Sequence, residues 1–159
     1  MILVTVGTQL AFDRLVGAVD EWASKQRGVE VFAQVGPSRM RFDHLQTRAF
    51  VPPDEANDLF QRADLIVSHA GMGSILTALK YRKPILIMPR KAGLGEHRND
   101  HQLATAKWLG TRPGVTVAWE ASDVARLIDA RSELQSGGGI PDFASAELID
   151  RLKSFISSC

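Results

Sequence analysis

The sequence predicts an α/β fold, a Rossmann-like parallel sheet with helices on both faces, and three observations support it. Short runs of Val, Ile and Leu recur along the chain. Each run is followed by a glycine, proline or polar turn and then by a stretch with helical apolar spacing. The runs are continuous rather than alternating, which is typical of strands that are covered on both faces. A chain of 159 residues with 45% hydrophobic content is long enough to bury such a sheet.

The first strand and the first helix are predicted from the beginning of the chain. Residues 1–6 form an apolar run that ends at Gly7. The next segment places five apolar side chains on one face of a helix: Leu15, Val16, Val19, Trp22 and Ala23. A strand followed by a helix is therefore the unit that the rest of the chain repeats.

The remaining elements follow the same alternation. Further strands are expected at 29–35, 48–51, 65–69, 85–88 and 115–118. Further helices are expected at 54–63, 72–82, 99–109, 122–130 and 142–157. The last helix follows a flexible glycine-rich loop at 137–141 and is too short to be a domain of its own. We therefore expect a single domain over 1–159. The apolar residues of the last helix are expected to pack on its core, and the alternative is that they contact a partner protein: Phe143, Leu148, Ile149, Leu152, Phe155 and Ile156.

Composition excludes several classes of function. Lysine and arginine number 19 against 18 aspartate and glutamate, so there is no basic field of the kind that binds nucleic acid. The only cysteine is Cys159, which rules out an internal disulfide and a thiolate metal cluster and favours the cytoplasm. No run approaches the roughly 20 apolar residues that span a bilayer. Any contact with a membrane is therefore expected to be peripheral.

Two glycine loops follow predicted strands, at the edge where open parallel sheets bind their ligands. The first, 6–9, ends the first strand, and the second, 68–74, ends the fourth strand and opens a helix. Glycines let backbone amides approach a ligand closely, and the beginning of a helix offers unpaired N–H groups and the positive end of its dipole. A diphosphate is the ligand that these features favour.

Simpler interpretations of the same residues stay open. Each loop is also compatible with an ordinary tight turn, and His69 with a hydrogen-bonded histidine at the end of a strand. The polar segment 89–102 suits the recognition of hydroxyl groups, but also a solvated surface loop. In the helix after the second loop, the spacing predicts core packing for Ile75, Leu76 and Leu79. Trp108 and Trp119 are expected in the core or at its rim.

Other nucleotide-binding folds are disfavoured. No G-x-G-x-x-G follows the first strand, and no G-x-x-x-x-G-K-[ST] occurs anywhere, which argues against dehydrogenase and P-loop chemistry. A phosphorelay receiver requires an acidic cluster after its early strands, where this chain has Gly7 and Thr8.

Three ordered blocks of sequence resemble the C-terminal domain of glycosyltransferase family 28. They are 4–8 with Phe12-Asp13, 69–74 with Ala78-Leu79 and Lys83-Pro84, and 99–104. The similarity is greatest to the single-domain members, which are a eukaryotic dolichol-linked UDP-N-acetylglucosamine transferase subunit and a bacterial exopolysaccharide glucuronosyltransferase subunit. The resemblance implies the C-terminal half of a GT-B glycosyltransferase, with a UDP-sugar as co-substrate.

The resemblance also implies which residues bind the donor. It implies that the two glycine loops surround the phosphates, that the 50–51 segment holds the uracil, and that the pair His101-Gln102 reads the sugar. The family commonly has a glutamate for the ribose at the position of Thr77, and a threonine cannot make the same bidentate contact. The donor-binding residues are therefore expected to be Gly7, Thr8, Gln9, Phe50, Val51, His69, Ala70, Gly71, Met72, Gly73, Ser74, Thr77, Asn99, His101 and Gln102.

The resemblance places the catalytic base outside this chain. Related two-domain enzymes carry the base and the acceptor site on their N-terminal domain, so a membrane-associated, acceptor-binding partner subunit is implied. It would bring a polyprenol-diphosphate-linked acceptor and hold the chain peripherally at the inner membrane. No metal or other cofactor is expected, since helix dipoles and amides stabilise the diphosphate. The basic segments 39–42 and 80–83 suit either a docking surface or an ordinary solvated surface.

The sugar stays open between glucuronate, N-acetylglucosamine and another hexose, with the extended 95–100 segment favouring exopolysaccharide synthesis. The alternative is a non-catalytic subunit that binds a nucleotide sugar, or that docks on a transferase and stimulates it. A UDP-sugar epimerase of the same fold would need both halves in one chain.

Overall fold

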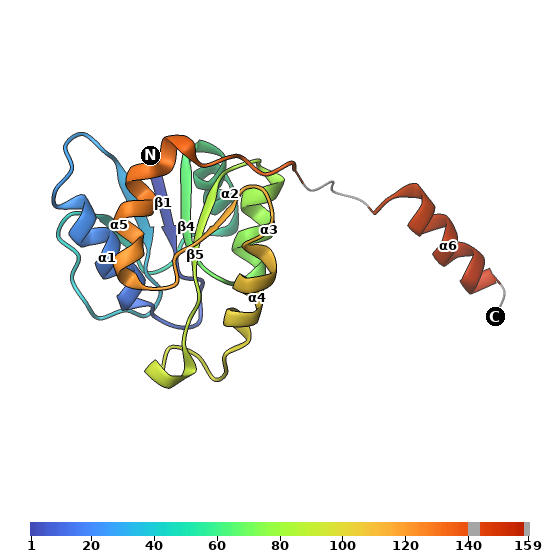
Figure 1. The fold of residues 1–159 in the computed structure, drawn as a ribbon, viewed down its shortest axis with the longest axis horizontal. Helices are drawn as coiled ribbons and strands as arrows, with labels where there is room; N and C mark the ends of the chain where they lie inside the picture. The colour runs from blue at the N-terminus through green and yellow to red at the C-terminus, as the bar shows by residue number, and fades with distance from the viewer. Residues whose placement is uncertain (140–143, 158–159) are drawn as a thin grey trace.

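A six-stranded parallel sheet forms the centre of the computed structural model, which describes residues 1–139 and 144–157 (Figure 1). The strand order is β3-β2-β1-β4-β5-β6. The strands are β1 (Ile2–Thr5), β2 (Val31–Gln34), β3 (Gln46–Arg48), β4 (Leu65–His69), β5 (Ile85–Met88) and β6 (Val115–Val117). The helices are α1 (Asp13–Ala23), α2 (Pro53–Arg62), α3 (Met72–Lys80), α4 (His101–Leu109), α5 (Ala121–Asp129) and α6 (Ala146–Ser157), with short 3₁₀ turns η1 (Ala92–Leu94) and η2 (Ala130–Glu133).

The side of the sheet on which successive strands are added changes between β3 and β4. From β1 the chain moves outward through β2 to β3, and it then returns to place β4 on the other side of β1. Ile2 pairs with Val31 on one side and with Leu65 on the other. This reversal creates a crevice at the carboxyl ends of β1 and β4, because their following loops lead to opposite sides of the sheet.

Alternate residues of each strand bury themselves on opposite faces of the sheet. Val4 and Val67 face a core with α1 and α5, whereas Leu3 and Ile66 face a core with α2, α3 and α4 (Figure 1). The central strands β1, β4 and β5 are largely apolar because both of their faces are covered, as the continuous apolar runs predict. The predicted α/β architecture is confirmed.

The prediction for the third strand was wrong in its position. It was expected at 48–51, but β3 is Gln46–Arg48, three exposed polar residues at the edge of the sheet. Its ladder ends when the amides of Val35 and Gly36 donate to the carbonyls of Arg48 and Ala49. An edge strand that is solvated carries no apolar run, so the hydrophobic pattern pointed to the residues after it.

One apolar side chain that was expected to pack lies at the surface instead. Leu76 is 44% exposed, although Ile75 on the same helix is fully buried. Trp108 and Trp119, expected in the core or at its rim, are 60% and 40% exposed and are not core residues. The stripe of α3 that meets the sheet is therefore narrower than the sequence pattern indicated.

The prediction that the last helix packs on the core was also wrong. None of the residues of α6 is buried, and Figure 1 shows the helix extending away from the sheet. Phe155 and Ile156 are 69% and 72% exposed. Phe143, which was assigned to the same face, lies outside the described residues. Amphipathic spacing specifies an apolar face but not the surface that covers it. Within the described residues, no helix has the length and apolar character needed to cross a bilayer.

Candidate functional site

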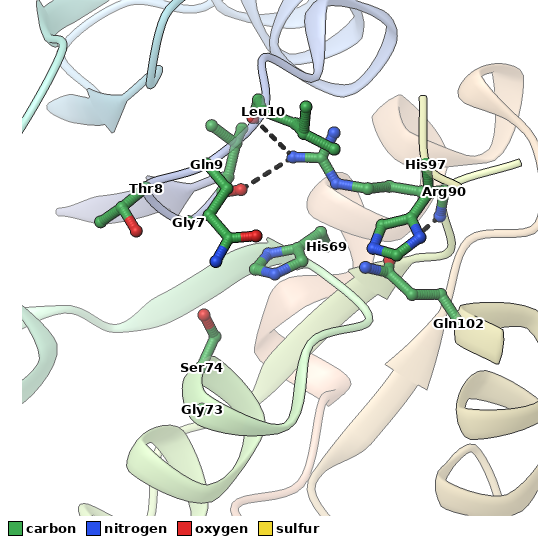
Figure 2. A pocket seen from close by; sticks show the side chains of 11 residues that line it. Gly7, Thr8, Gln9, Leu10, His69, Gly73, Ser74, Arg90, His97 and Gln102 are labelled. Carbon is green, nitrogen blue, oxygen red and sulfur yellow. Dashed lines mark hydrogen bonds between the residues drawn. The ribbon is translucent and has the colours of Figure 1, made fainter. Parts of the chain in front are cut away.

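A cavity of about 540 Å³ opens beyond the carboxyl ends of β1, β4 and β5, at the point where the strand order reverses (Figure 2). The loop after β1, the first turn of α3 and the segment after β5 contribute its walls. Its lining residues are Val6, Gly7, Thr8, Gln9, Leu10, His69, Gly73, Ser74, Arg90, His97 and Gln102.

A side chain of β2 holds the loop after β1 in place through hydrogen bonds. The buried Gln34 donates from Nε2 to the carbonyls of Gly7 and Ala49, each at 2.9 Å. Its Oε1 accepts a hydrogen bond of 2.8 Å from the hydroxyl of Thr5. Gly7 has a φ of 76°, a conformation that glycine adopts without strain. The turn that begins the cavity wall is thus built by three neighbouring strands.

The beginning of α3 forms the opposite wall. Gly71 is its N-cap and there is no side-chain cap, so the amides of the first turn have no partner within the helix. Gly73 and Ser74 of this turn line the cavity. A Cβ on Gly71 would lie 2.2 Å from Nε2 of His69, whereas a Cβ on Gly73 would meet nothing within 4 Å. The first glycine makes room for the histidine, and the second leaves space in the cavity.

His69 lies between the two walls as a neutral imidazole (Figure 2). Burial, followed by the positive charge of Arg90, lowers its pKa from 6.5 to about 4. The hydroxyl of Ser68 donates to the carbonyl of Thr5 at 3.0 Å, so it accepts from Nδ1 of His69 at 3.2 Å. This arrangement assigns the proton to Nδ1 and leaves Nε2 as a hydrogen-bond acceptor.

Arg90 is a residue of the cavity that the sequence did not single out. It is 2% exposed, and its guanidinium donates to four main-chain carbonyls. Burial lowers its pKa, which Glu96 opposes. The side chain of Gln102 accepts from the amide of Arg90 at 3.2 Å (Figure 2). Its position directly after β5 and Pro89, at the same edge as the glycine loops, is the signal that could have identified it. Leu10 and His97 were missed as well.

The structure brings about half of the predicted donor-binding residues to this cavity. Those that line it are Gly7, Thr8, Gln9, His69, Gly73, Ser74 and Gln102. Ala70, Gly71 and Met72 are not among the lining residues: Ala70 is 1% exposed, Gly71 lies next to the ring of His69, and Met72 is 42% exposed.

The other predicted residues lie outside the cavity. Phe50 is 59% exposed, and Val51 lines a smaller pocket of about 120 Å³ that also includes Gly7 and Thr8. The hydroxyl of Thr77 donates to the carbonyl of Gly73 at 2.8 Å, as α-helical threonines often do.

Two predicted residues of the third block lie on the exposed side of the segment after β5. The ring of His101 hydrogen-bonds the side chain of Asn99 and packs edge-on against the ring of His97, with centroids 4.5 Å apart. Of the predicted 99–102 segment, only Gln102 faces the cavity. Among the described residues, no group of three or more His, Cys, Asp or Glu side chains is placed to hold a metal ion.

A family model, the glycosyltransferase family 28 C-terminal domain, matches residues 1–137. The chain belongs to this family. A human protein named UDP-N-acetylglucosamine transferase subunit ALG13 is 32% identical over 68% of the chain, and the chain spans 10% of its length. The subunit of the same name from Yarrowia lipolytica is 26% identical over 78% of the chain, and the chain spans 67% of its length.

Solved structures share this fold. MurG from Acinetobacter baumannii superposes with a TM-score of 0.58 at 19% identity, over 83% of this chain and 42% of MurG. The solution structure of ALG13 superposes with a TM-score of 0.54 at 20% identity, over 95% of this chain and 93% of ALG13. At these identities the likeness concerns the fold alone.

Proposed function

We propose that this family 28 domain binds a UDP-sugar in the cavity between the ends of β1 and β4, as the donor-binding subunit of a two-component glycosyltransferase. The observation that carries the proposal is the cavity itself. It lies at the reversal of strand order and is walled by a glycine turn and by the uncapped beginning of α3. The unpaired amides at the beginning of a helix, beside a glycine turn, suit a diphosphate.

The same amides would also stabilise the departing UDP. Charge develops on the diphosphate as the bond to the sugar breaks, and the positive end of a helix dipole stabilises it without a metal. Neutral His69 adds no positive charge, but its Nε2 can accept a hydrogen bond from a hydroxyl group of the UDP-sugar. The guanidinium of Arg90 adds a fixed positive charge at the floor of the cavity.

For the sugar, we propose N-acetylglucosamine as the first donor to test, because two relatives carry UDP-N-acetylglucosamine transferase in their names. Glucuronate and other hexoses remain within the proposal, together with a role in exopolysaccharide synthesis. The word subunit in those names supports a partner. We propose that this partner is membrane-associated, supplies the base and presents a polyprenol-diphosphate-linked acceptor to a chain held in the cytoplasm.

Calorimetric titration of the purified chain tests donor binding directly. UDP, UDP-N-acetylglucosamine, UDP-glucuronate, UDP-glucose and NAD would each be titrated in the presence of EDTA. Binding is expected for UDP and at least one UDP-sugar, and not for NAD. His69→Ala should weaken it, and His44→Ala, at an exposed histidine outside the cavity, is the matched control.

The absence of binding to every nucleotide would contradict donor binding by the free chain.

A non-catalytic subunit is the second candidate, because Thr77 uses its hydroxyl within α3 and Phe50 is exposed, so neither contacts the cavity. A transfer assay with the partner distinguishes the two: variants of the cavity abolish transfer by a donor-binding subunit, but leave the rate unchanged if the chain only stimulates its partner.

A further inference from the structure

The loop after β1 is a wall of the cavity with little regular structure of its own. Residues 6–11 lie between β1 and α1, and Thr8, Gln9 and Leu10 are exposed. Gln34 donates a hydrogen bond to the carbonyl of Gly7, and its other described hydrogen-bond partners, Thr5 and Ala49, lie outside the loop. The position of the loop therefore depends on what holds its later carbonyl groups.

Arg90 holds those carbonyl groups from the other side of the cavity. Its NH2 group donates to the carbonyls of Val6 and Leu10, each at 2.8 Å (Figure 2). Its NH1 group donates to Ala11 at 2.5 Å and to Glu96 at 3.2 Å. The guanidinium also lies over the ring of Phe12, 4.6 Å from its centroid. One side chain from the end of β5 thus binds both ends of the 6–11 loop.

An ion pair between Arg14 and Glu96 links the segment after β5 to α1. The carboxylate of Glu96 accepts from Arg14 at 2.7 and 2.8 Å, and from the amide of Lys91 at 2.9 Å. Arg14 also donates to the carbonyl of Pro89 at 3.1 Å. The main-chain carbonyl of Glu96 also accepts a hydrogen bond from Arg90, so both arginines are hydrogen-bonded to Glu96. The 6–11 loop and the 90–96 segment are therefore linked as a single unit.

A buried guanidinium suits positioning better than it suits stability alone. A cation removed from water gains little over an apolar side chain of similar volume. The planar guanidinium, however, fixes the directions of several acceptors at once, which the single ammonium group of lysine cannot reproduce. Three carbonyls of the loop held by one such group leave it few alternative conformations.

We propose that Arg90 is a positioning residue that holds the 6–11 loop in its ligand-binding conformation before the ligand arrives. Preorganisation of a loop raises affinity because the cost of ordering it is not paid on binding. The effect on affinity rests on the proposed binding of UDP in this cavity. The effect on the loop does not, and it is measured without a ligand.

NMR relaxation of the wild-type chain is the first test. The order parameters of residues 7–11 are expected to match those of the strands, near 0.85, and values below about 0.6 would overturn the proposal. The second test compares Arg90→Lys with Arg62→Lys, a control at an exposed arginine of α2. Arg90→Lys should lower the order parameters of the loop but not those of β1 or β4, and Arg62→Lys should leave all of them unchanged.

Titration with UDP completes the experiment. Arg90→Lys should raise the Kd for UDP roughly tenfold, because part of the binding free energy would then be used to order the loop. Arg62→Lys should not change this Kd. An equally rigid loop or an unchanged Kd in a folded Arg90→Lys variant would overturn the proposal. If the wild-type chain does not bind UDP, the proposed function fails, but the order parameters of the loop still decide the role of Arg90. If Arg90→Lys does not fold, the wild-type order parameters decide it.

Discussion

Protonation of His69 should destabilise the fold as the pH falls. Its pKa is about 4 in the folded chain and 6.5 as its ordinary value, so between these values the unfolded chain binds the extra proton. Stability therefore falls as the pH is lowered through this window, and it is fully recovered above it. At pH 5 the linkage from this histidine alone costs about 2 kcal/mol relative to pH 7.5.

Urea unfolding at both pH values measures this cost. The difference in unfolding free energy between pH 7.5 and pH 5 should be about 2 kcal/mol larger for wild type than for His69→Gln, which cannot titrate. The same comparison with His44→Gln, at an exposed histidine, removes the contribution of other titrating groups. A Cε1 proton of His69 that titrates near 6.5 in NMR spectra would refute the reasoning, as would an equal pH dependence in the His69→Gln variant.

Three further predictions concern stability and binding. Gly71→Ala should lower the free energy of unfolding by about 1–3 kcal/mol in urea unfolding, because its Cβ would lie 2.2 Å from His69. Gly73→Ala, where a Cβ meets nothing, should leave stability unchanged or higher while it weakens UDP binding in calorimetry; equal destabilisation by both would contradict this account. Gln34→Leu should cost about 2 kcal/mol, because the carbonyl of Gly7 loses the donor and the hydroxyl of Thr5 loses the acceptor that Gln34 supplies, whereas Gln46→Leu on exposed β3 should cost little in the same assay. Deletion of α6 should shift the Tm by less than about 2 °C in calorimetric scans, because the helix buries no side chain, and a larger loss would show that it packs on the sheet in solution.

Local patterns in the sequence were sufficient for the architecture and for the edge of the sheet that holds the cavity. A strand buried on both faces has to be continuously apolar, so β1, β4 and β5 were visible as runs of Val, Ile and Leu. A loop that follows such a strand at the carboxyl edge has to lie near its neighbours, which located the loops that begin at Gly7 and at Ala70.

The errors arose where exposure depends on contacts between distant segments. Helical spacing predicted that Leu76 and the apolar face of α6 are buried, as Ile75 is, but only Ile75 packs in the core beside the sheet. The block at 99–102 was correctly ordered along the chain, yet the first turn of α4 directs Gln102 inward and leaves His101 exposed. Which face of a short helix meets a cavity depends on the angle at which the helix packs.

The sequence by itself determined the α/β fold, the two glycine loops and membership of family 28, because each depends on residues that are close together in the chain. Only the tertiary structure decided the contacts of Arg90, whose four carbonyl partners belong to residues 6, 10, 11 and 96. Main-chain carbonyls have no sequence signature, since every residue carries one. Their convergence on one guanidinium exists only once β1 and β5 lie in the same sheet.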